Sequence, residues 1–288
     1  MNKQFNQVII VGVGLIGSSL GRDLIKRKLA HNVVGVGRNP NNLKVALHQE
    51  AINQMIKLSD INNLRACITS ETELIILATP VETIKSYLKS LQGISKQVIV
   101  MDVGSTKGTL VREAERLGIN FVAAHPIAGT EKGGAAGGQL NLFQDKKCLL
   151  VPTSKQCQSS WKGVAQLWRD LGSAVIPMKA EAHDRILGAV SHLPHAAAYS
   201  LVLAISQIIS VEDEARFALG GLRDTVRIAA SPPEVWTDIF LENRRHVGRS
   251  LKAYIHFLNQ LEQLIETKNR LGLAKFLKKA QSIRLKLS

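Results

Sequence analysis

Short apolar runs alternate with amphipathic stretches through the first 178 residues of the 288-residue chain. The apolar runs are rich in Val and Ile and are bounded by Gly, Pro or Asn, which is typical of β-strands. Several are apolar on both faces, as strands of a sheet covered on both sides must be. This pattern predicts a doubly wound, parallel α/β domain. The expected strands are 7–14, 32–37, 74–79, 97–104, 120–126, 147–152 and 174–178, and the expected helices are 20–28, 43–49, 81–91, 109–117 and 160–171.

The pattern changes after residue 178, because no β-rich run recurs. Apolar residues in 251–265 fall at spacings of three and four, which places them in one stripe on a helix. The segment 183–209 is apolar nearly all round, which predicts a helix buried between others. We therefore predict an α/β domain over 1–178 and an all-helical domain over 179–288. The helical domain has more apolar surface than its size usually covers alone, so we expect a homodimer through it.

Composition places the chain among ordinary globular proteins, with 45% hydrophobic and 21% charged residues. Apolar runs such as 74–78 are far shorter than the roughly 18–20 residues of a membrane span, and the N-terminus has no signal-peptide pattern. The cysteines Cys67, Cys148 and Cys157 form no CxxC pair. We interpret them as reduced thiols and expect a cytoplasmic protein with no membrane partner, no disulfide and no metal site.

The net charge of +14 is concentrated near the C-terminus. From Asn243 onward there are eleven Lys and Arg residues against two acids, Glu262 and Glu266. Such a charge could bind nucleic acid, form a solvated helical face, or attract small anions. No zinc-finger spacing, RNA-recognition signature or interleaved aromatics accompany it. We therefore expect no nucleic-acid partner.

The clearest local motif is Gly12-x-Gly14-x-x-Gly17, which lies between the first expected strand and a helix. In this setting Gly12 allows a tight turn, Gly14 lets the backbone approach a pyrophosphate, and Gly17 permits close packing of helix on strand. The motif predicts dinucleotide binding.

The second expected strand ends in Gly37-Arg38, where an NAD-binding domain usually has an acid that grips the ribose 2′-hydroxyl. A guanidinium tolerates a 2′-phosphate better than a carboxylate does. The sequence thus favours NADP, with NAD possible. The alternative is that Arg38 is solvated or stacks on adenine.

Polar residues cluster where expected strands end and where the helical domain begins. His125 ends one strand, and Ser105 follows another within Asp102-Val-Gly-Ser-Thr-Lys107. Ligands bind at the carboxyl ends of strands in α/β sheets. The helical domain opens with His183-Asp184, followed by 191–195, SHLPH. Arg223 and Arg227 add two guanidinium groups, which suit a carboxylate, although a surface salt-bridge helix would show the same residues.

Seven motifs, which follow one another along the chain, resemble those of the prephenate/arogenate (cyclohexadienyl) dehydrogenases of tyrosine biosynthesis. The resemblance runs from residue 7 to about 260. It implies a Rossmann-like dinucleotide domain, a helical dimerisation domain, and an active site in the cleft between them. It also implies oxidation of a ring alcohol by a nicotinamide cofactor with release of CO₂. The motifs are GVGLIG, DVGSTK, HPIAGTEKGG, NLF (141–143), HD (183–184), SHLPH and GLRDTVRIAASPPEVW.

The resemblance also implies roles for individual residues. His125 matches the base that takes the proton of the ring hydroxyl, Ser105 a serine that contacts this histidine and the nicotinamide, and His195 a second histidine facing the substrate. Arg227 matches the arginine that binds the ring carboxylate. Other substrate-binding positions would be Thr130, Glu131, His183, Ser191 and Trp236, and the cofactor would contact Gly12, Gly14, Leu15, Ile16, Gly17, Arg38, Thr79, Pro80 and Ser105.

The chain departs from this family's pattern in lacking the ribose-binding acid and in showing no chorismate mutase or ACT segment. The choice between prephenate and arogenate stays open, because Glu131 would suit the ammonium of arogenate and Lys132 the keto acid of prephenate. The resemblance points to arogenate, since lack of the ribose-binding acid is a feature of the arogenate-using branch of the family.

Two other functions compete with this one. A hydroxyacid dehydrogenase would place a catalytic lysine in a GxxxGxxxK setting in the second domain, and 179–209 has none in that setting. A dinucleotide sensor would use the fold without chemistry.

Overall fold

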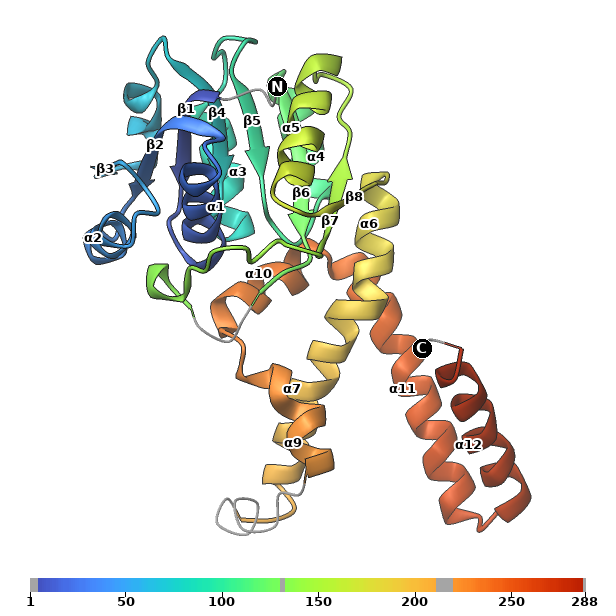
Figure 1. Ribbon diagram of the computed structural model, residues 1–288. Helices are drawn as coiled ribbons and strands as arrows, with labels where there is room; N and C mark the ends of the chain where they lie inside the picture. Colours follow the sequence, from blue (N-terminus) through green and yellow to red (C-terminus); the bar gives the residue numbers. More distant parts are fainter. Residues whose placement is uncertain (1–4, 130–132, 211–219, 287–288) are drawn as a thin grey trace.

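The structure is a computed structural model that describes residues 5–129, 133–210 and 220–286. It consists of an α/β part followed by a helical part, and two arms of the helical part extend away from the sheet (Figure 1). Residues 74–77 and 99–102 illustrate why the α/β part forms, because every side chain in these two strands is buried. Continuous apolar runs of this kind are stable only in a sheet that helices cover on both faces.

Eight strands form a single sheet in the order β3-β2-β1-β4-β5-β6-β7-β8. The neighbours from β3 to β6 are parallel, whereas β7 runs antiparallel to β6 and β8 parallel to β7. The expectation of a wholly parallel sheet is wrong at this edge. A parallel neighbour needs a crossover along the sheet, and the chain after β6 instead returns at the same end. The strands are β1 Phe5–Val11, β2 Ala30–Gly37, β3 Gln54–Lys57, β4 Thr72–Leu77, β5 Ile99–Asp102, β6 Phe121–Pro126, β7 Lys147–Val151 and β8 Ala174–Pro177.

Strand β3 is an element that the hydrophobic pattern missed. It has four residues, all of them at least partly exposed, and it pairs only with β2 at the sheet edge. An edge strand of this length has no buried run to mark it in the sequence.

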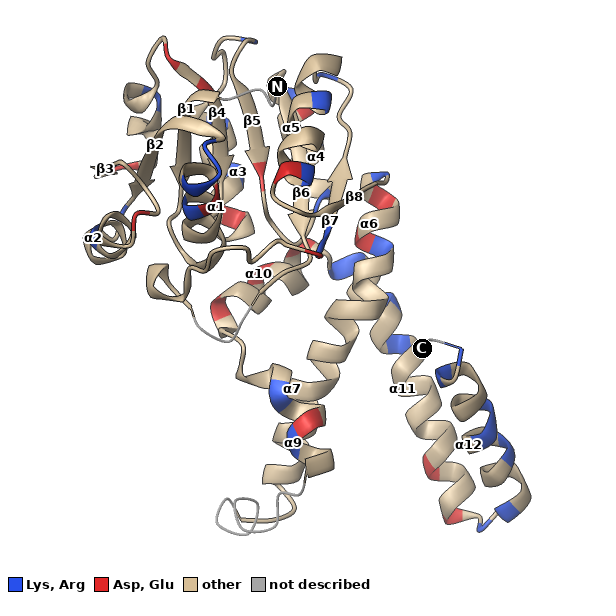
Figure 2. Cartoon of the chain, viewed as in Figure 1, with Lys and Arg blue, Asp and Glu red and all other residues tan. Residues whose placement is uncertain are grey.

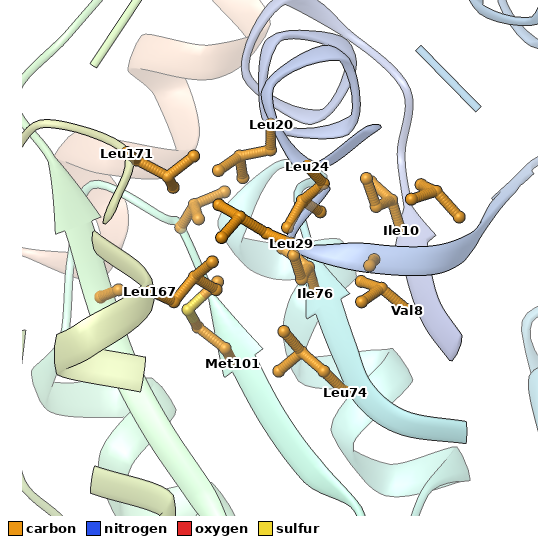
Figure 3. Close-up of a cluster of buried hydrophobic side chains, with 14 of the residues drawn as sticks. Val8, Ile10, Leu20, Leu24, Leu29, Leu74, Ile76, Met101, Leu167 and Leu171 are labelled. Carbon is orange, nitrogen blue, oxygen red and sulfur yellow. The ribbon is translucent and has the colours of Figure 1, made fainter. Parts of the chain in front are cut away.

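Helices cover both faces of the sheet. One face packs against α1 Leu15–Lys26, α2 Pro40–His48 and α5 Gln158–Asp170, and the other against α3 Val81–Ser90 and α4 Gly108–Leu117. Figure 3 shows the first of these cores, with Leu20 and Leu24 of α1 gathered over Ile76 and Met101 of the central strands. This packing fixes the carboxyl ends of β1, β4, β5 and β6 along one edge of the sheet.

The helical part begins with one continuous helix, and the described residues beyond β8 contain no strand. The expectation of an all-helical second part is thus confirmed. The first helix has a five-residue π-helical stretch, and such π-bulges are frequent at functional sites. The elements are α6 Ala180–Leu187, the π-helix Gly188–His192, α7 Leu193–Ser206, α9 Gly220–Val226, the 3₁₀ turn Arg227–Ala230, α10 Pro233–Glu242, α11 Arg244–Glu266 and α12 Arg270–Arg284.

Much apolar surface in the helical part is exposed within one chain. The continuous helix Ala180–Ser206 is long and apolar enough to cross a membrane by length and composition, but its first half packs into the protein and buries His183. Val190 and Leu203 on the same helix are each 67% exposed, so the expectation of a helix buried between others is not met by this chain alone. Lys and Arg gather along α12 and at the start of α11 (Figure 2).

Candidate active site

The glycine motif forms the turn between β1 and α1. Gly12 has φ +94°, a conformation that favours glycine, and a Cβ there would lie 2.6 Å from the Ala78 carbonyl oxygen. A Cβ on Gly17 would overlap the Gly12 carbonyl oxygen, which keeps α1 close to the strand. A Cβ on Gly14 would meet nothing within 4 Å, so open space lies in front of this backbone. The three glycines are therefore arranged as a pyrophosphate-binding turn requires.

A cavity of about 550 Å³ lies in front of this turn. Arg38 stands on its rim, and Asn39 caps α2 by accepting hydrogen bonds from the backbone N–H groups of Asn41 and Asn42. The residues that line it include no carboxylate: they are Gly12, Val13, Gly14, Gly37, Arg38, Asn39, Asn42, Ala78, Thr79, Pro80, Thr83 and Tyr87. The cavity suits an anionic nucleotide.

A second cavity of about 350 Å³ continues from the first toward the helical part. Thr79 and Pro80 line both cavities, and the Thr79 hydroxyl is buried with no hydrogen-bond partner among the described residues. Leu15, Ile16 and Ser105 line the second cavity from the α/β side, while Pro232, Val235 and Ile239 line it from the helical side. The residues fit an extended dinucleotide whose far end reaches the cleft between the two parts.

Ser105 belongs to a loop that a buried ion pair holds in place. Lys107 and Asp102 are both completely buried, and the Lys107 ammonium donates to the Asp102 carboxylate. The other hydrogen bonds of this carboxylate come from the backbone N–H groups of Gly104, at 2.8 Å, and Ala124, at 3.3 Å. Removing either partner of such a buried pair would leave an uncompensated charge in the interior, which is strongly destabilising. The pair thus ties the Ser105 loop to β6.

His125, at the carboxyl end of β6, contacts the helical part directly. Its Nδ1 atom lies 2.9 Å from Nε2 of His183 on α6, and Nδ1 of His183 lies 2.9 Å from Oδ1 of Asp184. Burial, with smaller contributions from His183, Lys107 and His192, holds the pKa of His125 well below its usual range. His125 is therefore a neutral imidazole at physiological pH and able to accept a proton.

A second group of rings lies on the helical side of the cleft. His195 of α7 stacks on Trp236 of α10, and its Nδ1 donates to the carbonyl oxygen of Ser191 at 2.9 Å. Burial lowers the pKa of His195, and the nearby Arg227 guanidinium contributes to this. Arg227 itself is exposed at the start of the 3₁₀ turn. A guanidinium beside a histidine that stacks on an indole can bind the carboxylate of a ring-shaped substrate.

The described residues contain no group of three or more His, Cys, Asp or Glu that could hold a metal.

Two family models account for most of the chain: the nucleotide-binding domain of prephenate dehydrogenase matches residues 20–177, and its dimerization domain matches residues 179–279.

The chain belongs to the prephenate dehydrogenase family.

Similar proteins agree with this assignment over nearly the whole chain. The cyclohexadienyl dehydrogenase of Zymomonas mobilis is 31% identical over 98% of this chain and 96% of its own length, and the prephenate dehydrogenase of Bacillus subtilis is 29% identical over 99% of this chain and 76% of its own. Among solved structures, prephenate dehydrogenase from Aquifex aeolicus in complex with hydroxyphenyl propionate and NAD⁺ superposes with a TM-score of 0.88, at 35% identity and 98% coverage of both chains. The arogenate dehydrogenase of Synechocystis gives 0.76 at 27% identity, over 98% of this chain and 100% of its own.

This prephenate dehydrogenase family member is therefore an enzyme of NAD(P)-dependent oxidative decarboxylation in tyrosine biosynthesis. The fold expected from the resemblance, a Rossmann-like domain followed by a helical domain, is confirmed.

The structure brings together most of the residues that the sequence suggested. The cofactor positions line the two connected cavities, apart from Gly17, which supports the turn from behind. His125 and His183 are in contact, and His195 lies between Ser191 and Trp236. Thr130 and Glu131 lie outside the described residues, as does Lys132.

Two residues of the site had no assigned role in the sequence analysis. Asp184 binds His183 and also caps α4, and the Asn243 side-chain amide donates to the Asp184 carbonyl oxygen at 2.7 Å and contacts Nδ1 of His192 at 3.1 Å. Asp184 could have been noticed through its place beside His183. Asn243 lies at the junction of α10 and α11, where an asparagine gives no signal of a buried role.

Proposed function

We propose that this enzyme oxidises arogenate, prephenate or both, with NADP preferred to NAD. Support for the cofactor comes from the cavity in front of the glycine turn. Its lining contains no carboxylate and includes Arg38, whose guanidinium could pair with a ribose 2′-phosphate. Coulomb attraction to Arg38 would favour NADP, since an acid in this region would repel the phosphate and accept from a free hydroxyl.

His125 is the proposed catalytic base, and its position is the observation on which the proposal depends. It stands at the carboxyl end of β6 facing the helical part, its Nδ1 is engaged by His183, and its lowered pKa keeps it unprotonated. When bound, the nicotinamide supplies the hydride acceptor. As the ring hydroxyl becomes a carbonyl, His125 takes its proton. Loss of CO₂ is then driven by aromatisation of the ring.

The remaining residues orient the substrate. Arg227 would bind the ring carboxylate and Ser105 would contact both His125 and the nicotinamide, while Trp236 and His195 would form one wall of the pocket. An arginine suits this role because it can bind a carboxylate with two parallel hydrogen bonds. Arg227 would orient the ring carboxylate, which leaves as CO₂, by hydrogen bonds alone and without a covalent bond.

We infer that the enzyme is a homodimer through its helical part and functions in the cytoplasm. The match to a dimerization domain supports the first point, as does the exposed apolar surface of α7, α11 and α12. Among the described residues, α12 buries no side chain within its own chain, and Leu271 on it is 77% exposed. A second copy would remove such surface from water.

The experiment that tests the function is a direct assay. The protein is mixed with prephenate or with arogenate, and with NADP or NAD at equal concentrations, while the absorbance of reduced cofactor is followed. We expect turnover with at least one of the two acids and a higher kcat/KM with NADP. Binding of NADP without turnover of either acid would favour a sensor, and a higher kcat/KM with NAD would contradict the reading of Arg38.

A further inference from the structure

Three residues from two parts of the chain form a continuous line of hydrogen bonds. It runs from Asp184 Oδ1 to His183 Nδ1 and from His183 Nε2 to His125 Nδ1, with both distances 2.9 Å. The side chain of His183 is completely buried and both of its ring nitrogens are used within the line. His183 therefore has no ring nitrogen left for a substrate, in contrast to the substrate-binding position that the resemblance implied for it.

The chemistry of Asp184 sets the direction of these hydrogen bonds. Its carboxylate accepts from the backbone N–H groups of Lys107 and Gly108, each at 2.8 Å, at the start of α4. These bonds and the contact with His183 outweigh burial and lower the pKa of Asp184, so it is ionised and can only accept. The proton between Asp184 and His183 must therefore sit on His183 Nδ1. The opposite arrangement would place a lone pair of His183 against a lone pair of Asp184.

The proton on His183 Nδ1 in turn sets the tautomer of His125. Burial lowers the pKa of His183, so the ring is neutral and protonated at Nδ1 only. Its Nε2 then carries a lone pair and must accept from His125 Nδ1. The neutral ring of His125 has one proton, which Nδ1 holds, and its lone pair is on Nε2.

The geometry points to Asp184 and His183 as positioning residues that hold His125 in one tautomer, with the lone pair of Nε2 available to the ring hydroxyl. This inference rests on the proposed role of His125 as the base. In the reaction the substrate O–H bond breaks and an N–H bond forms at Nε2, so His125 becomes an imidazolium and the hydroxyl oxygen keeps the electron pair. The wrong tautomer would present an N–H to the hydroxyl and could not take its proton.

The position of Asp184 also links this tautomer to the cofactor loop. Its carboxylate caps α4 directly after the segment that contains Ser105, while Asn243 donates to its backbone carbonyl from the other side. One side chain thus sets both the base and the loop beside the nicotinamide cavity. The charged or titratable groups around His125 are His183 on α6, Lys107 before α4, His192 in the π-helix and Cys148 on β7, whose thiol contacts the His125 backbone.

Two variants of His183 of similar size separate positioning from packing. In His183→Gln the amide oxygen can accept from His125 Nδ1 and the amide N–H can donate to Asp184, so the order of donors is kept. In His183→Leu both bonds are lost. We expect kcat to fall on the order of 10²-fold in the Leu variant and by less than about 10-fold in the Gln variant, with cofactor KM little changed in both. Ser160→Ala on α5, which removes the buried hydrogen bond that the Asn120 side chain donates to the Ser160 hydroxyl, serves as the control for folding. Equal kcat in folded Gln and Leu variants would overturn the proposal.

Nitrogen NMR of the ¹⁵N-histidine-labelled enzyme reads the tautomer without substrate. Signals are assigned by comparing the wild type with the single histidine variants. The proposal expects His183 and His125 to be protonated at Nδ1 in the wild type, with an unprotonated Nε2 on His125. A proton on Nε2 of His125 would overturn it, even if the enzyme turns over. The expected tautomers in a protein with no turnover would instead show that the proposed function fails while the hydrogen-bond line stands. Should the Leu variant fail to fold, the wild-type spectrum decides alone.

Discussion

The indole ring of Trp236 lies against the imidazole of His195, with ring centroids 3.5 Å apart and planes inclined by 20°. The same indole meets His192 edge-on at 6.0 Å, so Trp236 contacts two histidines of the helical part at once. Because Nδ1 of His195 already donates to the Ser191 carbonyl oxygen, the stacked ring can turn little, and its Nε2 is the nitrogen left for a ligand. Trp236 thus fixes one wall of the proposed substrate pocket.

Replacing Trp236 should affect substrate binding more than chemistry. In Trp236→Leu the stacking that orients His195 is lost, and we expect KM for the cyclohexadienyl acid to rise roughly 10-fold, as aromatic pairs contribute about 0.5–1.5 kcal/mol beyond their buried area. Trp236→Phe keeps an aromatic face and should stay closer to the wild type. Steady-state kinetics on both variants, with circular dichroism to check folding, measure this. Identical KM values in the Leu variant and the wild type would contradict the role of the stack.

Arg227→Ala should lose a charge-assisted pair with the ring carboxylate. The expected defect lies mainly in KM and corresponds to about 2–4 kcal/mol for a pair that substrate binding desolvates. Arg169→Ala, at an exposed position on α5, is the matched loss of a guanidinium and should leave KM unchanged. A fall in kcat at constant KM would show that Arg227 acts on the transition state instead.

Gly37→Asp should move the cofactor preference toward NAD. A Cβ at residue 37 would meet only Leu43 side-chain atoms, at 3.9–4.0 Å, which is ordinary van der Waals contact. Its carboxylate would repel a 2′-phosphate and accept from a 2′-hydroxyl. Gly37→Asn, similar in size but uncharged, separates charge from bulk. The ratio of kcat/KM for NADP and NAD is the measurement, and an equal shift in both variants would contradict the electrostatic explanation.

The stability of the enzyme should fall as the pH drops below about 6.5. Burial lowers the pKa of His192 to about 4, and it also lowers those of His125, His183 and His195. Below about pH 6.5 these histidines therefore bind protons in the unfolded chain but stay neutral in the folded chain. The free energy of unfolding consequently increases with pH in this range. For His192 alone the full loss, reached below pH 4, is about 3 kcal/mol.

Thermal unfolding from pH 7 to pH 4 tests this linkage. We expect Tm to fall across that interval in the wild type and to fall less in His192→Gln, which cannot take up the proton. The comparison uses the slope of Tm against pH and not its absolute value, because the substitution also changes the contact with Asn243. Parallel slopes for the two proteins would refute the assignment of His192.

Local patterns in the sequence predicted the elements of the fold better than their pairing. The buried strands were predictable because residues such as Ile75 and Val100 sit in runs that are apolar on both faces. The reversal at β7 was not, since strand direction depends on the path of the chain between strands. The exposed side chains of β3 gave no signal at all.

The site shows the same division. The glycine turn is a local motif, and its conformation follows from neighbouring residues. The contact between His125 and His183 joins residues 58 positions apart, and the stack of His195 on Trp236 joins two helices. Such contacts depend on how the helical part packs against the sheet. This packing cannot be predicted from the spacing of residues along the chain. The family resemblance identified the individual histidines as site residues, whereas only the structure shows that His183 contacts His125.

The most direct test of the account is the comparison of kcat in His125→Asn and His195→Asn at saturating cofactor and substrate. His125→Asn keeps a hydrogen-bonding side chain but cannot take the proton of the ring hydroxyl, so its kcat should fall roughly 10²–10⁴-fold, the usual size of general-base catalysis. His195→Asn, which alters the pocket wall, should change kcat far less. Near-normal kcat in His125→Asn together with loss of turnover in His195→Asn would contradict the account and make His195 the base.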